Sequence, residues 1–318
     1  MTTSLLCASH SPLMTCFAKE PEVWQELQEA YANRAAAVAD FDPEVVIAFG
    51  SDHYNGFFLK LMPAFCVGFA AHAVADIGGT PGTLNVDSSS AVELVNALRA
   101  KDVDPATSTD MTLDHAFSQS IATLCGGLGR YPTIPIFINC ISEPYVPFRR
   151  SRLLGAAVGE FVASSNKRVL FLASGGMSHH PRRYYPELGD GPPEVTAWQL
   201  SGGDTDASLS SQEWLDRLEV MHHEGAEMIV RGERTAADMC LNAEADQRFL
   251  DVLTKQPLPA FDDWEPEAVV REAGIGSMEL HTWIAASAAH EAAGGGKPSL
   301  DFYAVTPELG IATGIVSA

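Results

Sequence analysis

Basic residues and paired cysteine motifs are scarce in this sequence. Its 318 residues include 20 Lys or Arg against 41 Asp or Glu, which gives a formal net charge of −21. Such a surface repels the phosphate backbone of nucleic acids, so we expect no nucleic-acid partner. None of the cysteines forms the C-x-x-C pair that zinc ribbons and redox sites require. We therefore expect reduced, buried cysteines.

Long apolar segments are also absent. No uncharged apolar run reaches about 18 residues, so we expect no membrane span. The first residues, MTTSLLCASH, lack the basic segment that opens a signal peptide. These absences predict a cytoplasmic protein. The sequence also lacks an internal repeat and a clear interdomain linker, and we expect one domain over residues 1–318.

Short apolar runs rich in β-branched residues alternate with helical patterns along the chain. The runs typical of buried strands are Ser4–Ala8, Val45–Phe49, Thr133–Ile138 and Val169–Ala173. Helical patterns cover Glu22–Val38, Ala91–Ala100, Phe117–Leu124 and Arg152–Ser164. This alternation predicts a layered α/β/α fold around a central, largely parallel or mixed sheet.

The second half of the sequence opens with a segment of different composition. Residues 181–211 are rich in Gly, Pro, Asp and Ser, which predicts a long loop that serves as a lid or a mobile excursion. Further helices are expected over Gln212–Gly232, Ala236–Leu253 and Ser277–Ala292. The tail Leu300–Val316 is expected to return a strand or a hairpin to the sheet.

Three of the predicted strands are each followed by histidine. His10 follows the first strand, His53 the second, and His179 with His180 the strand at 169–173. Because ligands of open α/β sheets bind beyond the carboxyl ends of the strands, parallel strands would aim these imidazoles at one crevice. A single histidine at a strand end is more often an ordinary loop residue. Only the recurrence of histidine after three strands points to a shared site.

Two histidines with one carboxylate leave open positions on a metal, as in non-haem Fe(II) oxygen enzymes. The sequence offers several carboxylates. Asp52 and Asp114 each adjoin a histidine, and adjacent residues in extended chain point apart. Glu279 lies in the late helix beside apolar residues and would need a partner if it is buried. A surface glutamate is the alternative interpretation.

Several motifs resemble the class III extradiol ring-cleavage dioxygenases. They are SHSPL at 9–13, DHYNGFF at 52–58, DHAF at 114–117, FINC at 137–140 and LFLASGGMSHHP at 170–181. The branch they resemble cleaves 2,3-dihydroxyphenylpropionate. The resemblance covers residues 4–180 and the late helix around 274–290, and it is weak across 182–270.

Carried over by position, the resemblance implies that His10, His53 and Glu279 bind Fe(II). It implies acid–base roles for His115 in DHAF and for His179 in SGGMSHHP. His180 beside His179 and His281 beside Glu279 are competing positions.

The implied activity is extradiol opening of a catechol by O2, and a homo-oligomer is expected. Histidine suits proton transfer because its pKa lies near neutrality. A different catechol, a metal-free binding protein on the same fold, and a zinc hydrolase remain as alternatives. If the substrate carries a carboxylate, a cation should meet it, and the candidates considered are Arg149, Arg150, Arg152, Arg182 and Arg183.

Overall fold

Four parallel strands form the centre of the computed structural model, which describes residues 3–318. They are β1 (Thr3–Ala8), β9 (Val169–Ser174), β2 (Val45–Gly50) and β8 (Thr133–Ile138), in that spatial order. β2, β8 and β9 are buried along their whole length, as expected for strands covered on both faces. The four predicted strands and the α/β class are confirmed.

Antiparallel strands make the sheet mixed at both ends. β11 (Ile311–Ser317) pairs with β1, and β10 (Ser299–Thr306) pairs with β11, so the tail forms the expected hairpin. On the other side β3 (Phe65–Gly68) is antiparallel to β8 and carries β6 (Ala106–Ser108). A second, small sheet contains β5 (Gly82–Thr83), β4 (Ala71–Ala73) and β7 (Met111–Leu113). These strands are too short to leave a periodic signal in the sequence.

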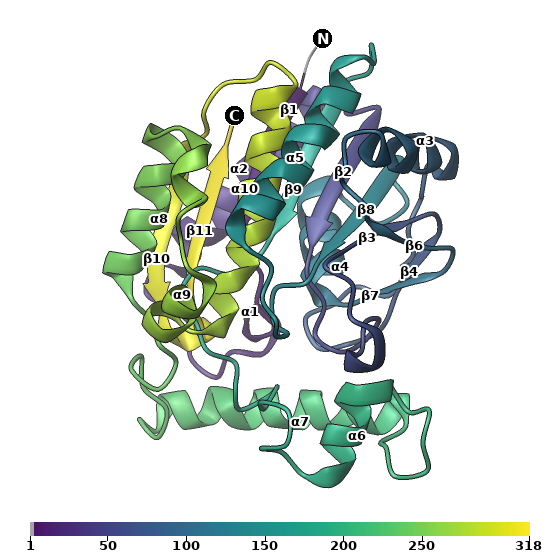
Figure 1. Ribbon diagram of the computed structural model, residues 1–318. Coiled ribbons are helices and arrows are strands. Elements are labelled where there is room, and N and C mark those ends of the chain that lie inside the picture. The colour runs from purple at the N-terminus through teal and green to yellow at the C-terminus, as the bar shows by residue number, and fades with distance from the viewer. Residues whose placement is uncertain (1–2) are drawn as a thin grey trace.

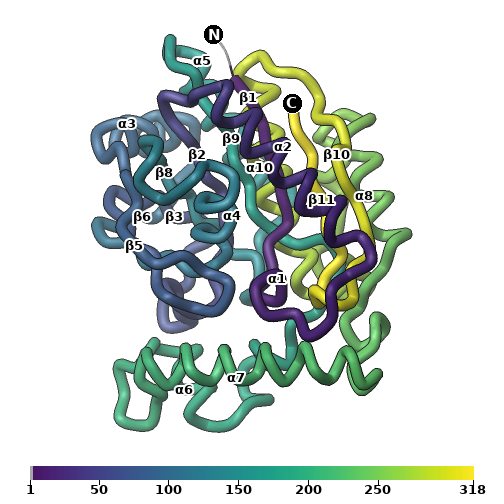
Figure 2. Tube along the Cα trace, turned by 180° about the vertical axis from the view of Figure 1, so that it is seen from behind, coloured from purple at the N-terminus to yellow at the C-terminus, as the bar shows by residue number. Residues whose placement is uncertain are grey.

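Helices cover both faces of the large sheet (Figures 1 and 2). One face carries α3 (Ser88–Arg99), α5 (Phe148–Ala163), α8 (Ala243–Lys255) and α10 (Leu280–Ala292). The other carries α2 (Trp24–Phe41) and α4 (His115–Cys125). The backbones of α5 and α10 pack closely, because a Cβ atom on Gly155 would lie 2.0 Å from the Ala285 carbonyl oxygen.

The remaining helical segments are short or lie away from the two faces. They are α1 (Leu13–Cys16), α6 (Pro193–Ser201), α7 (Ser211–Val230), α9 (Pro266–Ala273) and the 3-10 turns Leu59–Leu61, Leu258–Phe261, Ile275–Glu279 and Pro307–Leu309. In both views α6 and α7 lie across the end of the sheet where β1, β2 and β9 finish (Figures 1 and 2). None of the described helices is long and apolar enough to cross a membrane.

Two sequence predictions need correction. Residues 181–211 do not form one loop, since α6 occupies Pro193–Ser201. Its Trp198 is buried and donates from Nε1 to the Tyr54 carbonyl oxygen at 2.8 Å. Tertiary packing therefore stabilises this helix, although the Pro and Gly residues on either side of it are typical of a loop. The helix predicted from Ala236 begins at Ala243, because the Asn242 side chain caps it by accepting from the Ala245 N–H.

Candidate metal centre

Three histidines lie just beyond the carboxyl ends of adjacent strands. The spatial order β1, β9, β2 brings together His10, His179 and His53, which follow these strands in turn. All three side chains are buried. The strand-end crevice therefore holds imidazoles from chain segments that are far apart in the sequence.

Glu279 reaches the same place from the 3-10 turn that precedes α10. Its Oε1 lies 3.4 Å from His10 Nε2 and 3.4 Å from His53 Nε2, and its side chain is fully buried, which excludes the surface-glutamate interpretation. The Ser51 hydroxyl donates to Oε1, and the Gly176 N–H donates to Oε2 at 2.9 Å. Burial alone would raise the pKa of Glu279, but His10 and His53 hold it well below its usual value.

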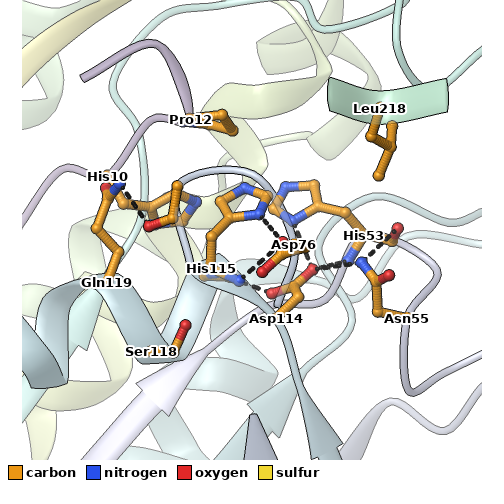
Figure 3. Close-up of polar contacts among 12 residues, drawn as sticks. His10, Pro12, His53, Asn55, Asp76, Asp114, His115, Ser118, Gln119 and Leu218 are labelled. Atoms are coloured by element: carbon orange, nitrogen blue, oxygen red, sulfur yellow. Dashed lines mark hydrogen bonds and ion pairs between the residues drawn. The ribbon is translucent and has the colours of Figure 1, made fainter. Parts of the chain in front are cut away.

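The other ring nitrogen of each of these histidines is anchored. His10 Nδ1 shares a hydrogen bond with the Ser174 hydroxyl at 2.8 Å. His53 Nδ1 lies 3.0 Å from Asp114 Oδ2, which also accepts from the His53 N–H at 2.7 Å (Figure 3). Metal-binding histidines are commonly oriented by such partners. Two anchored imidazoles that aim Nε2 at one carboxylate oxygen fit a divalent metal with open coordination positions.

His115 is the first residue of α4 and lies beside this group. Its ring stacks on His53 with centroids 4.5 Å apart. Its Nδ1 is 2.5 Å from Asp76 Oδ2, which also accepts from the His115 N–H at 3.1 Å (Figure 3). Ring nitrogens of His10, His53 and His115 all lie within 4.8 Å of one another, so these three could also hold a metal. The equal approach of Glu279 Oε1 to His10 Nε2 and His53 Nε2 favours Glu279 as the third ligand.

His179 lies near the other carboxylate oxygen of Glu279. Its Nδ1 donates to the Met177 carbonyl oxygen at 2.9 Å, which leaves Nε2 as an acceptor 4.0 Å from Glu279 Oε2. Burial lowers the pKa of His179 to about 4. Gly276 gives the ring its space, since a Cβ atom there would lie 2.1 Å from His179 Nε2.

The two competing histidines point elsewhere. His180 Nδ1 accepts from the Ile275 N–H at 3.2 Å. His281 is buried between α5 and α10, where it bonds Ser151 at 2.8 Å and stacks on Phe148. Neither side chain lines the cavity beside Glu279.

Comparisons with known proteins identify the family of this chain. Residues 4–311 match the family described as the catalytic LigB subunit of aromatic ring-opening dioxygenase. The chain belongs to the LigB family. This confirms the resemblance to ring-cleavage dioxygenases and makes the protein an oxidoreductase of aromatic catabolism.

Relatives in the LigB family cover the chain almost from end to end. A protein of Paraburkholderia xenovorans (strain LB400) named 2,3-dihydroxyphenylpropionate/2,3-dihydroxicinnamic acid 1,2-dioxygenase is 40% identical over 97% of this chain and 95% of its own length. A protein of Rhodococcus jostii (strain RHA1) with the same name is 39% identical over 100% of this chain and 98% of its own length. The crystal structure of an uncharacterized Escherichia coli K12 protein shares the fold, with a TM-score of 0.52, 12% identity and coverage of 99% and 98%.

Five of the residues outside the proposed ligand set that line the cavity at the LigB-family site are called the cover here: Pro181, Tyr184, Tyr185, His222 and Arg234. Together with the site histidines these residues line a cavity of about 30 Å³, which has room for a water molecule. Ligand pockets usually measure roughly 300–1,000 Å³, so side chains of the cover must move to admit an aromatic substrate.

His222 and His223 lie in the motif MHHEG at 221–225, which by itself predicts a solvated helix face. The structure contradicts this for His222. Its side chain is buried, its Nδ1 donates to the Leu218 carbonyl oxygen at 2.7 Å, and it stacks on Tyr184 at 3.7 Å. The polar neighbours of His222 in α7 gave no sign that aromatic side chains pack against this helix.

The sequence also gave no sign of the residues that support the ligands. Asp76 and Ser174 could not be identified from the sequence. No motif in the neighbouring residues indicates that a carboxylate or a hydroxyl contacts a histidine far away in the chain. Asp114 was considered only as a metal ligand. Its carboxylate instead caps α4, by accepting from the Ala116 N–H at 2.8 Å, and orients His53. Its place directly before a helix was the available signal.

Proposed function

We propose that this LigB-family chain is a single-domain, Fe(II)-dependent extradiol dioxygenase. Its substrate is 2,3-dihydroxyphenylpropionate or a similar 3-substituted catechol, and O2 opens the ring beside the diol. The observation that carries the proposal is the approach of His10 Nε2 and His53 Nε2 to one oxygen of buried Glu279, at 3.4 Å each. The names of the full-length relatives supply the substrate class.

His10, His53 and Glu279 are the proposed ligands. When bound, Fe(II) would supply Lewis-acid and redox chemistry, since two histidines and one carboxylate would leave coordination positions for a catechol and O2. Ser174 and Asp114 keep the two imidazoles in the orientation that presents Nε2.

His179 is proposed to take the proton of a substrate hydroxyl. Its Nδ1 proton is committed to the Met177 carbonyl oxygen, so Nε2 is free to accept. His115 is proposed to return a proton as the ring opens. Asp76 holds its Nδ1–H and would stabilise the imidazolium form. Both atoms of O2 enter the product, which is a hydroxymuconic-type acid.

Oxygen consumption by the metal-loaded protein tests the proposal. The chain is loaded anaerobically with Fe(II), then given air-saturated buffer and one of several catechols. We expect oxygen uptake equimolar with substrate and a yellow ring-opened product. Protein loaded with Zn(II) is the matched control and should consume no oxygen. No uptake with any catechol would exclude the dioxygenase.

Cytoplasmic location and assembly into a homo-oligomer belong to the same proposal. The support is a strongly acidic chain together with the general preference of soluble enzymes for symmetric assembly. Light scattering after size-exclusion chromatography measures the mass, and a monomer at micromolar concentration would contradict the oligomer.

A further inference from the structure

Arg234 is the buried arginine of the cover. It follows α7, is 8% exposed, and lines the cavity beside His222 and His53. Across residues 3–318, no carboxylate lies within ion-pair distance of its guanidinium. A buried guanidinium that no carboxylate contacts directly is costly, so a ligand that brings an anion would relieve the cost.

Four of the five arginines suggested from the sequence pair with carboxylates elsewhere, and the fifth, Arg150, does not line the cavity. Arg152 forms a bidentate pair with Asp262 at 2.7 Å. Arg182 and Arg183 pair with Glu187 and Glu224 on the surface. None of these side chains lines the cavity. Arg234 was not considered from sequence, because it lies in the region of weak resemblance.

Contacts with Tyr184 hold Arg234 in place. Its Nη1 donates to the Tyr184 hydroxyl at 2.6 Å, and the guanidinium carbon lies 5.0 Å from the centre of that ring. Tyr184 is itself stacked on His222. The hydroxyl fits against α7 because residue 225 is glycine, where a Cβ atom would lie 2.2 Å from it. One donor is used, and the others of the guanidinium fork stay available to a carboxylate.

We propose that Arg234 binds a carboxylate on the substrate side chain and so selects catechols that carry an anionic substituent. This inference rests on the proposed function. The His53 ring lies 5.0 Å from Tyr185, which lies 6.4 Å from His222, so a row of rings leads from the metal ligands to Arg234. A catechol ring at the ligands would direct its side chain along this row.

Paired substrates test the assignment. Initial rates and anaerobic binding are measured for Fe(II)-loaded wild type and Arg234→Gln, with 2,3-dihydroxyphenylpropionate and with 3-propylcatechol, which lacks the charge. We expect Arg234→Gln to weaken binding and kcat/KM for the acid by roughly 10- to 100-fold, as for a lost charge-assisted hydrogen bond. For 3-propylcatechol we expect a change within about twofold. Arg234→Lys should restore part of the preference for the acid.

Arg183→Gln is the matched control, since Arg183 pairs with Glu224 outside the cavity and should leave both substrates unaffected. Equal losses on the acid and on 3-propylcatechol, or no loss on the acid, would overturn the role of Arg234. If wild type cleaves neither catechol, the proposed function fails instead. Activity of Arg234→Gln on 3-propylcatechol reports that the variant is folded.

Discussion

One carboxylate oxygen of Asp76 accepts hydrogen bonds from two nitrogen atoms of His115, one in the ring and one in the backbone. This Oδ2 atom accepts from the ring Nδ1 at 2.5 Å and from the backbone N–H at 3.1 Å. The carboxylate therefore fixes both the direction of the ring and the nitrogen that carries the proton, and it leaves Nε2 for proton transfer.

Asp76→Asn should lower kcat by roughly 100-fold or more while Fe(II) content stays unchanged, since an amide no longer stabilises the imidazolium or fixes the tautomer. The pH profile of kcat should shift as well, which simple loss of packing would not cause. Asp110→Asn is the matched control, because Asp110 pairs with exposed His72 at 3.0 Å on the surface. An unchanged kcat in Asp76→Asn would refute a positioning role.

Metal content separates the proposed ligands from the proposed acid–base residues. His10→Ala, His53→Ala and Glu279→Ala should each bind Fe(II) more than roughly 100-fold more weakly, since the loss of a residue that merely supports a ligand costs 10- to 100-fold. His179→Ala and His115→Ala should keep the metal and lose roughly 100- to 10,000-fold in turnover.

His115→Ala is the decisive member of this series, because a ring nitrogen of His115 also lies close to those of His10 and His53. Iron is measured by atomic absorption after gel filtration. Loss of iron in His115→Ala with retention in Glu279→Ala would reassign the third ligand.

The positions of His10, His53 and His179 were predictable because each follows an apolar run within a few residues. Local chain geometry at a strand end and the parallel order of neighbouring strands bring such residues together. Glu279 lies at the start of a helix on another part of the chain, and the resemblance to the family was the main indication of its role.

Asp76 and Arg234 could not be predicted, for a physical reason. Asp76 lies outside any regular element and meets His115 from a separate loop, 39 positions away in the sequence. Arg234 reaches the cavity only because α6 and α7 fold across the end of the sheet (Figure 1). Long-range packing of this kind leaves no periodic pattern in the sequence.

Asp246 supports the loop that carries His179. Its carboxylate accepts from the Ser178 N–H and from the Ser178 hydroxyl, both at 2.7 Å, and from the Tyr303 hydroxyl at 2.9 Å. Asp246→Asn turns one acceptor into a donor, so we expect a loss of about 2–3 kcal/mol in unfolding free energy and a lower kcat. Tyr303→Phe removes one of these bonds and should cost about 1 kcal/mol with kcat unchanged. Urea titration measures the unfolding free energy of both variants, and steady-state kinetics measures their kcat. Equal losses in Asp246→Asn and Tyr303→Phe would argue against a specific role for the Asp246–Ser178 contacts.

His222 makes the stability of the protein depend on pH. Burial lowers the pKa of His222 from 6.5 to about 3, so the unfolded chain binds a proton that the folded protein excludes. The stabilisation is complete above the unfolded pKa and is lost as pH falls below it. Between about pH 7 and pH 5, His222 should remove up to about 2 kcal/mol from the unfolding free energy of the metal-free protein. His222→Phe should reduce this pH dependence by the contribution of one histidine, whereas His223→Gln, at the exposed neighbouring position, should leave it intact. Identical slopes in wild type and His222→Phe, measured by urea titration at each pH, would show that His222 is protonated without cost in the folded state.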